Sequence, residues 1–387
     1  MGEAIITSRS AAQEEAIPVV PGYHSILATV RDYQGKLLKD YPINCKDGSV
    51  WYNYKTNETG KVLFTCNSGA ANISINNVID GYRYLDFPNH IINCDCPIGG
   101  QTRLAFNIPK STTTNFSFAK NSKIRFLHDQ ECSGVIIGGG GGGSSCGYSD
   151  SYGYQSNRGG SGGGGGFVTY INNYLFNSNM NYNINIGRGG RGGTTKANYY
   201  ETASGDKGYI INHNSCNQPG NAGGTSYISN TNLSANGGKG GQNRLVAPST
   251  RSDGGGYGGA FNESGGSSGC NDGGGGGGGE PQLWFNKTQY NSSPSLKLGS
   301  FGTSGGYPYG GNGLRANHIN KFDSNSWSWY ETFVNIVQAE DGKGPGGGGG
   351  AADSCPLYTS SAEKYVIRQT SGGNGAAGIC KLNMVNY

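Results

Sequence analysis

The residues in this sequence that could do chemistry are few, and their spacing matches no common catalytic pattern. Two G-x-S-x-G stretches, at 159–163 and 265–269, have the spacing that can place a nucleophilic serine on a tight turn between a strand and a helix. Both lie in glycine-rich sequence, where such matches arise by chance. The chain also lacks a G-x-x-x-x-G-K-[ST] phosphate loop and an H-E-x-x-H helix. We therefore expect no catalytic residue and interpret the chain as a protein that is not an enzyme.

Residues that bind metals are also poorly placed for coordination. The five histidines are scattered without metal-ligand spacing, and Cys94 and Cys96 are closer in sequence than a zinc knuckle requires. The ten cysteines form an even set that would allow disulfides outside the cell, but we interpret most of them as small buried hydrophobic residues. We expect no metal site and no cofactor.

Recognition chemistry is better represented than catalysis. Several segments combine Tyr and Trp with Ser, Gly and Asn, the mixture that antibody paratopes use for contact area and adaptable hydrogen bonds. Such rings stack on sugars or fill pockets on a protein, and the sequence does not separate these targets. The alternative is that the rings only cover the ends of a glycine core. The candidate binding residues are Tyr148, Tyr152, Tyr154, Tyr307, Tyr309, Trp327 and Trp329.

The elements that must position these residues are marked by glycine. Only nine of the 72 glycines precede Gly134, which predicts a domain boundary near residue 133. Hydrophobic residues make up 34% of the chain and charged residues 14%, so the low hydrophobicity is not offset by charge as in most disordered chains. Glycine-rich runs occupy 138–143, 162–166, 187–193, 237–241, 273–279 and 346–350.

Two structures are open to such runs. A flexible linker is the commoner one, because glycine loses the most backbone entropy on ordering. Polyglycine II is the other: threefold extended helices without side chains approach closely enough for hydrogen bonds between them. Apolar residues flank the runs, as in 135–137 and 167–168, and strand patterns lie between them. We therefore predict ordered rods, with a β-hairpin over 167–186 that turns at 177–179.

The N-terminal part has a different pattern. Residues 1–18 are a polar arm, and from 19 to 92 short strand patterns alternate with turn signals at Gly35, Gly48 and Gly60. This order resembles immunoglobulin-like repeats of the carboxypeptidase-regulatory type, which implies a β-sandwich acting as a spacer or weak binding module. We expect residues 93–121 to form a linker or a small β subdomain.

The glycine-rich part, 122–387, carries a second resemblance. The succession from VII into GGGGGG, then GGGGGFVTYINNYLF, NINIGRGGRGG and GGTSYISNTNLSANGGKGG resembles the glycine-rich domain of phage tail-fibre and other virion proteins. The match is strongest over 122–241 and less regular from 242 onward. It implies a polyglycine II bundle whose intervening loops touch the host. The expected fold class is mainly β: an immunoglobulin-like sandwich followed by a polyglycine II bundle with β-hairpins.

Charge and targeting signals reduce the classes of partner that we expect. A net charge of +4 and only two arginines in GRGGRGG predict no nucleic-acid partner, and we expect Arg188 and Arg191 to lie in a turn. The sequence shows neither a signal-peptide pattern nor an apolar stretch of membrane-spanning length, so we expect no membrane insertion.

The leading hypothesis is therefore a phage virion protein assembled in the host cytoplasm and acting outside the cell. Its N-terminal region would attach to other virion structural proteins, and its aromatic loops would bind a bacterial surface protein or glycan. A non-binding structural decoration or spike of the capsid or tail is the alternative, and a cell-surface matrix protein is a third possibility.

Overall fold

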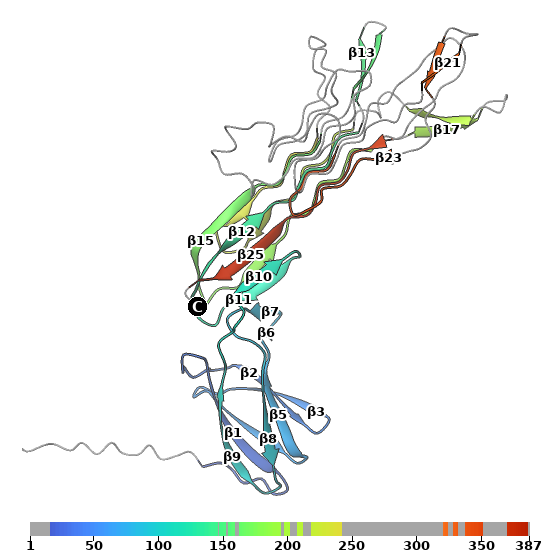
Figure 1. The fold of residues 1–387 in the computed structure, drawn as a ribbon. Coiled ribbons are helices and arrows are strands. Elements are labelled where there is room, and N and C mark those ends of the chain that lie inside the picture. The colour runs from blue at the N-terminus through green and yellow to red at the C-terminus, as the bar shows by residue number, and fades with distance from the viewer. Residues whose placement is uncertain are drawn as a thin grey trace, which may run out of the picture. The chain divides into compact units, whose positions relative to one another are not determined.

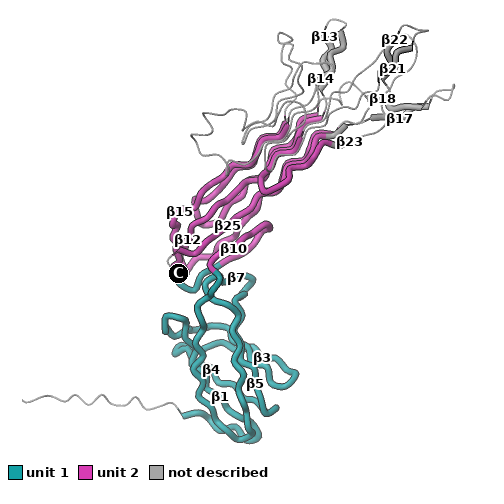
Figure 2. Tube along the Cα trace, viewed as in Figure 1, with its two compact units in different colours: residues 1–113, 125–128 teal, residues 114–124, 129–387 magenta. Residues whose placement is uncertain are grey.

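The computed structural model describes two kinds of region. Complete residues are described over 16–145, 162–194, 218–241, 339–350 and 372–385; for 147–151, 154–158, 197–201, 207–211, 320–323, 328–331, 337–338 and 370–371 only the strand backbone is described. These residues form strands and extended segments without a helix, which confirms the mainly β class (Figure 1). The chain divides into unit 1, Met1–Thr113 with Arg125–His128, and unit 2, Thr114–Ile124 with Asp129–Tyr387 (Figure 2).

Unit 1 contains two sheets. The first has the order β4-β1-β9, with β1 antiparallel to β4 and parallel to β9; the second has the antiparallel order β3-β2-β5-β8. A short hairpin, β6–β7, completes the unit. The strands are β1 (His24–Arg31), β2 (Pro42–Asp47), β3 (Val50–Lys55), β4 (Lys61–Cys66), β5 (Gly69–Ile75), β6 (Val78–Ile79), β7 (Tyr82–Tyr84), β8 (His90–Cys96) and β9 (Gln101–Asn107).

Both sheets contribute side chains to one hydrophobic core. Ile26 and Phe64 come from the first sheet and Ile43 and Ile73 from the second, and all four are fully buried. The alternating burial of β2 and β4 follows from the period of two of a strand, which turns every second residue inward. Each fully buried side chain of this size contributes about 1.5–3 kcal/mol, so this core is the main stabilising feature of unit 1.

The turn signals of this part are confirmed by the backbone. Gly48 joins β2 to β3 with a φ of 57°, and Gly60 precedes β4 with a φ of 66°. A Cβ on Gly60 would also lie 3.0 Å from two side-chain carbons of Leu37. Glycine is therefore required at position 60 both for the left-handed backbone and for the close approach.

The segment 93–121 contains regular structure of both units. It includes the end of β8, the whole of β9 and, in unit 2, β10 (Asn115–Phe118). Residues 125–128 then return to unit 1, where the N–H groups of Leu127 and His128 bind the buried carboxylate of Asp86. The two units are thus not consecutive in sequence.

Strands of two sheets lie at the start of unit 2. One has the antiparallel order β10-β25-β12-β15, and the other contains β20-β19-β16-β11. The strands are β11 (Ser122–Arg125), β12 (Gln130–Ile137), β15 (Val168–Phe176), β16 (Tyr182–Asn185), β19 (Ser226–Ile228), β20 (Ser234–Ala235) and β25 (Ile379–Met384). β25 comes from the far end of the sequence and lies between β10 and β12, so it joins the beginning and the end of this unit.

The hairpin predicted over 167–186 is wrong. β15 pairs with β12, whereas β16 pairs with β11 and β19 in the other sheet. The turn at Asn177 therefore carries the chain from one sheet to the other. The buried rings of Phe176 and Tyr182 pack edge to face with centroids 5.0 Å apart. This contact favours the passage of the chain between the two sheets over pairing of β15 with β16.

Candidate functional site

The residues 138–143 form the central segment of unit 2. Every N–H group of this six-glycine run donates a hydrogen bond, and the acceptors alternate among three neighbouring segments. The last three glycines of the run donate to the same three segments as the first three, and each acceptor is now three positions earlier in the sequence. The three accepting segments are therefore antiparallel to the central segment. The donor–acceptor pairs are Gly138–Phe167, Gly139–Gly224, Gly140–Ala376, Gly141–Gly164, Gly142–Asn221 and Gly143–Gly373, at 2.8–2.9 Å.

The carbonyl groups of the central segment show the same threefold cycle. They accept from three other segments, and here the residue numbers of donor and acceptor rise together, so these partners are parallel. The donor–acceptor pairs are Gly238–Gly139, Gly190–Gly140, Gly349–Gly141, Gly241–Gly142 and Gly193–Gly143, at 2.8–2.9 Å. Among the described residues the central segment thus has six hydrogen-bonded neighbours.

The six neighbours form a closed ring. Together with the central segment we call them the glycine bundle, and its segments are among the magenta tubes of Figure 2. Each ring segment donates to or accepts from the next, and parallel and antiparallel partners of the central segment alternate around it. In ring order the segments are 187–193, 218–224, 236–241, 162–167, 346–350 and 372–378. The contacts that join them are Gly224–Arg188, Gly223–Gly238, Gly164–Lys239, Gly166–Gly346, Ala376–Gly347 and Gly375–Gly190, donor first, at 2.7–2.8 Å.

Side chains are excluded from the interior of this bundle. A Cβ on Gly139, Gly140 or Gly141 would lie 2.0–2.1 Å from a carbonyl oxygen of a neighbouring segment. Such contacts are far below van der Waals distance, and the obstacle is backbone that cannot rotate away. The larger residues of the ring, such as Arg188 and Arg191, are exposed. The spacing of three between Arg188 and Arg191 therefore matches one outward-facing position in every three residues. The prediction that these two arginines lie in a reverse turn is wrong.

One end of the bundle joins the sheets. At this end, four bundle residues directly adjoin or closely follow a strand of unit 2. They are residues 138, 167, 187 and 378. Ser226, at the start of β19, is fully buried there: its hydroxyl accepts from the N–H of Gly187 and donates to the carbonyl of Ile137, at 2.9 and 2.7 Å. This end is thus fixed by the sheets and by the serine.

The opposite end, which we call the loop end, is where the chain leaves the bundle. Gly143 binds Gly193 and Gly373, and Ser145 binds Gln218. Gly350 likewise binds Glu340 and Gly373, and Gly241 binds Gly220. These contacts bring together the boundaries of four stretches of chain: 146–161, 195–217, 242–338 and 351–371. All four stretches therefore start and finish at the loop end.

The candidate binding residues of the sequence fall within two of these stretches. Tyr148 lies in β13 (Gly147–Ser151) opposite Asn157, and Tyr154 lies in β14 (Tyr154–Arg158) opposite Ser151. Trp329 lies in β22 (Ser328–Glu331), opposite Phe322 of β21 (Asn320–Asp323). The other four, Tyr152, Tyr307, Tyr309 and Trp327, lie outside the described residues.

A third stretch contains aromatic residues that the sequence reasoning missed. In 195–217, β17 (Ala197–Glu201) pairs with β18 (Lys207–Ile211), and the register places Tyr199 opposite Tyr209. The Asn-Tyr-Tyr run at 198–200 was a usable signal, because it has the composition of the other candidate segments.

Comparisons with known proteins leave the family open. No family model matches the chain, and no curated protein does. Among solved structures, one described as "Structure of the Streptococcal ancillary pilin" is similar over 49% of this chain and 59% of the pilin chain, at 9% identity and a TM-score of 0.19. A likeness this weak indicates neither a fold nor a function.

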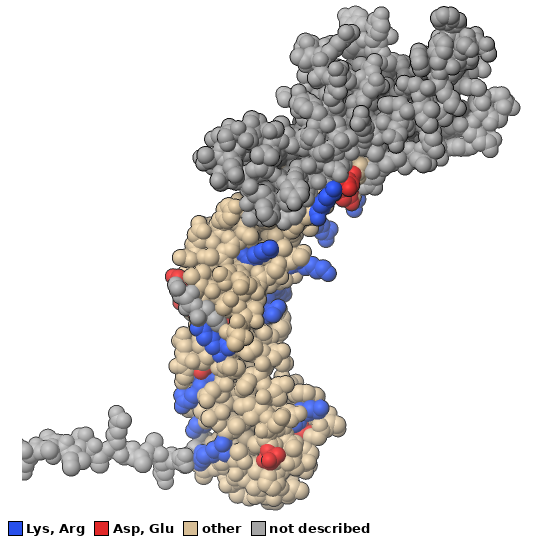
Figure 3. All heavy atoms as spheres, viewed as in Figure 1, with Lys and Arg blue, Asp and Glu red and all other residues tan. Residues whose placement is uncertain are grey.

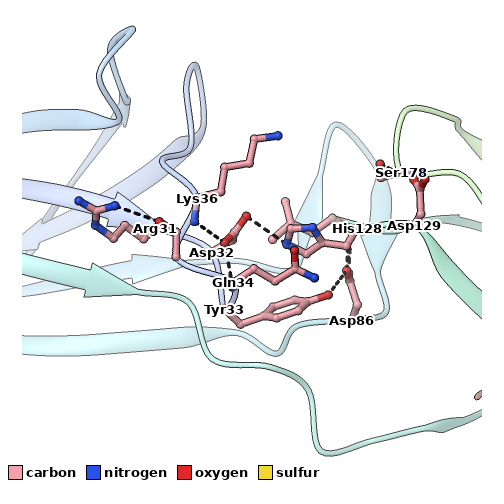
Figure 4. A network of polar contacts seen from close by, with 11 residues as sticks. Arg31, Asp32, Tyr33, Gln34, Lys36, Asp86, His128, Asp129 and Ser178 are labelled. Carbon is pink, nitrogen blue, oxygen red and sulfur yellow. Dashed lines mark hydrogen bonds and ion pairs between the residues drawn. The ribbon is translucent and has the colours of Figure 1, made fainter. Parts of the chain in front are cut away.

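A polar network in unit 1 contains an acid–histidine pair of the kind that catalysis uses (Figure 4). His128 Nε2 lies 3.0 Å from Asp32 Oδ2, and the Tyr33 hydroxyl donates to Asp86 at 3.1 Å. Both carboxylates are buried and also accept backbone N–H groups: Asp32 from Gln34 and Lys36, Asp86 from Leu127 and His128. Burial raises the pKa of Asp86, which its hydrogen bonds only partly offset. The network holds residues 125–128 against the rest of unit 1, and we assign it this structural role.

The described part of the chain offers few other candidate sites. Those residues include neither a cluster of His, Cys, Asp and Glu able to hold a metal ion nor a helix long and apolar enough to cross a membrane. On the face drawn in Figure 3, the Lys and Arg side chains of the described residues are scattered rather than gathered in one patch. The loop end of the glycine bundle is therefore the candidate functional site.

Proposed function

We propose that this chain is a receptor-binding protein of a phage particle, a tail-fibre or tail-tip adhesin that recognises the bacterial host surface. In this proposal the glycine bundle is a polyglycine II bundle and unit 1 is an immunoglobulin-like sandwich that attaches it to other virion structural proteins. The partner is a bacterial surface protein or glycan, and no catalysis is involved.

The observation that carries the proposal is the common exit of four chain stretches at the loop end. A closed ring of six segments around a central one holds the ends of these four stretches through backbone hydrogen bonds. The stretches between them are then free to vary in sequence without disturbing the bundle, as binding loops on a rigid scaffold do. Their Tyr, Trp, Ser and Asn content supplies contact area at low entropic cost.

The polyglycine II assignment rests on the hydrogen-bond period. A polyglycine II helix has three residues per turn and makes its hydrogen bonds to neighbours rather than within itself. The central segment repeats its partners every three residues and donates every N–H group to another segment. An immunoglobulin-like unit 1 is supported by two sheets, of three and four strands, around one core.

The test is competition for adsorption. Purified full-length protein should bind host cells and reduce phage adsorption in a concentration-dependent way. Replacing Trp327 and Trp329 together by Ala should weaken that inhibition at least tenfold with an unchanged melting temperature. Trp51→Ala is the matched control, because Trp51 is 54% exposed on β3 of unit 1 and belongs to none of the proposed binding stretches.

The structural alternative makes the opposite prediction in the same assay. A bundle closed by backbone hydrogen bonds would also serve as a durable spike that binds nothing. Protein that neither binds host cells nor reduces adsorption, but is assembled into particles, would reject the adhesin proposal and favour the spike.

A further inference from the structure

Four cysteines gather at one end of the unit 1 core. Cys45, Cys66 and Cys96 are buried members of that core, and Cys94 is half-buried against it. Cys66 is the last residue of β4 and Cys96 the last residue of β8, so the two belong to different sheets. Each of these two buried thiols therefore lies at the end of its strand, one in each sheet.

Cys66 and Cys96 both lie beside His24. Both cysteines are 0% exposed, and His24 Nδ1 lies 2.8 Å from the carbonyl oxygen of Pro97, the residue that follows Cys96. Nearby backbone oxygens fix the two sulfurs: Cys66 Sγ lies 3.8 Å from the carbonyl oxygen of His24, and Cys96 Sγ lies 3.3 Å from that of Cys94. A disulfide needs two β-carbons about 3.5–4.5 Å apart, and the contacts that Cys66 and Pro97 each make with His24 bring the two cysteines near one another.

Cys94 is the competing partner for Cys96, and strand geometry disfavours it. The two residues are at positions i and i+2 of β8, so their α-carbons are roughly 6.6–6.8 Å apart and their side chains point the same way. That spacing is at the upper limit for a disulfide, and parallel Cα–Cβ directions do not bring the sulfurs into bonding geometry.

We propose that Cys66 and Cys96 form a disulfide that links the two sheets of unit 1 when the protein meets an oxidising environment. The oxidant is a low-molecular-weight disulfide: the two protein thiols lose two protons and two electrons, one S–S bond forms, and the small disulfide is cleaved to two thiols. The bond closes the chain between positions 66 and 96, which contains β5, β6, β7 and β8.

Burial of the two thiols slows disulfide formation without making the disulfide itself unfavourable. Burial raises the pKa of Cys96 to about 12 and also raises the pKa of Cys66, so little thiolate is present at neutral pH. Because the thiolate is the attacking species, the rate rises about tenfold per pH unit below these pKa values. The same burial protects the finished bond from reductants. The protein therefore stays reduced in the cytoplasm and converts outside it.

The experiment uses the full chain, reduced and then incubated with oxidised glutathione at pH 7.0 and 8.5. We expect mass spectrometry of tryptic and chymotryptic peptides to show a Cys66–Cys96 link, formed more than ten times faster at the higher pH. The unit 1 melting transition should rise by about 10 °C on oxidation and return with reductant. The rise should be absent in Cys66→Ser and present in Cys94→Ser and Cys45→Ser.

A second preparation keeps the result decisive if the folded protein blocks access. The unfolded, reduced chain is refolded in a glutathione redox buffer and mapped in the same way. Free thiols at both positions in both preparations, a Cys94–Cys96 link or glutathione adducts alone would overturn the proposal. The outcome is independent of host binding, so its failure would leave the adhesin proposal untouched.

Discussion

Single glycines in the central segment decide whether the bundle closes. A Cβ at position 141 would lie 2.0 Å from the carbonyl oxygen of Lys239, and the hydrogen bond from Gly141 to Gly164 fixes the backbone that would have to move. We predict that Gly141→Ala destabilises unit 2 by about 3 kcal/mol or more, because neither side of the clash can rotate away. Thermal unfolding followed by calorimetry measures the change.

The matched control for that variant lies on the neighbouring segment. Lys239→Ala alters an exposed side chain while its carbonyl oxygen stays in place, so we expect a change of at most about 0.5 kcal/mol. Equal effects of the two substitutions would mean that the interior of the bundle has room for side chains.

Asp47 gives unit 1 a defined response to acid. Its carboxylate accepts the N–H groups of Asn67 and Ser68, each at 3.0 Å, and the Ser68 hydroxyl. Burial raises the pKa of Asp47, but these hydrogen bonds outweigh it and hold the pKa below its ordinary value. A lowered carboxylate pKa adds stability that is complete above the unfolded-state pKa of about 4 and is lost as pH falls through the folded-state pKa.

We therefore predict a pH-dependent effect of Asp47→Asn. The variant should lose about 1–2 kcal/mol at pH 7, and the difference from the wild type should shrink below pH 4. Urea unfolding at pH 7 and pH 3 measures it, with Asp95→Asn at an exposed position as the control. A difference that stays constant over this range would show that the carboxylate charge is not what matters.

At the scale of elements, the sequence predicted the mainly β class and the short strands of unit 1. Strand alternation and turn glycines are local signals, and both sheets of unit 1 are built from segments that carry them. The hairpin over 167–186 failed because two strands close in sequence can pair with distant ones, and β12 and β11 are those partners. The ring order was also beyond the sequence, since glycines have no side chains to specify their neighbours.

The ring makes the stretches at the loop end separable elements. Gly193 and Gln218 flank the stretch 195–217 and are adjacent, because a Cβ on Gly193 would lie 2.1 Å from the carbonyl oxygen of Gln218. A turn of about four residues can replace the stretch without straining the bundle. We predict that this replacement changes the melting temperature of unit 2 by less than about 3 °C.

Limited proteolysis and calorimetry of that deletion variant test the prediction. The comparison is Gly190→Ala, which keeps the stretch but places a Cβ 1.9 Å from the carbonyl oxygen of Asn221 and should lower the melting temperature much more. If the deletion were the more damaging change, the stretch would be part of the folded scaffold rather than carried by it.

At the scale of the whole molecule, the return of residues 125–128 means that unit 1 cannot be cut out at its first boundary. Phe126 is fully buried, and Leu127 and His128 supply N–H groups to the buried Asp86 carboxylate at 2.8 and 3.0 Å. A chain that ends at 113 lacks these residues, so it loses an aromatic core residue and leaves a buried charge short of donors. Each loss costs roughly 2–4 kcal/mol, a large part of the stability of a small domain.

We predict that a fragment 16–128 is more stable than 16–113 by at least about 3 kcal/mol, measured by urea unfolding followed by Trp51 fluorescence. The control is the fragment 16–124, which has nearly the same added length but lacks 125–128. Because the partners that Asp86 and Asp32 have in residues 125–128 are missing from it, 16–124 should behave like 16–113. Equal stability of 16–124 and 16–128 would instead assign the gain to residues 114–124, and with it move the boundary of unit 1.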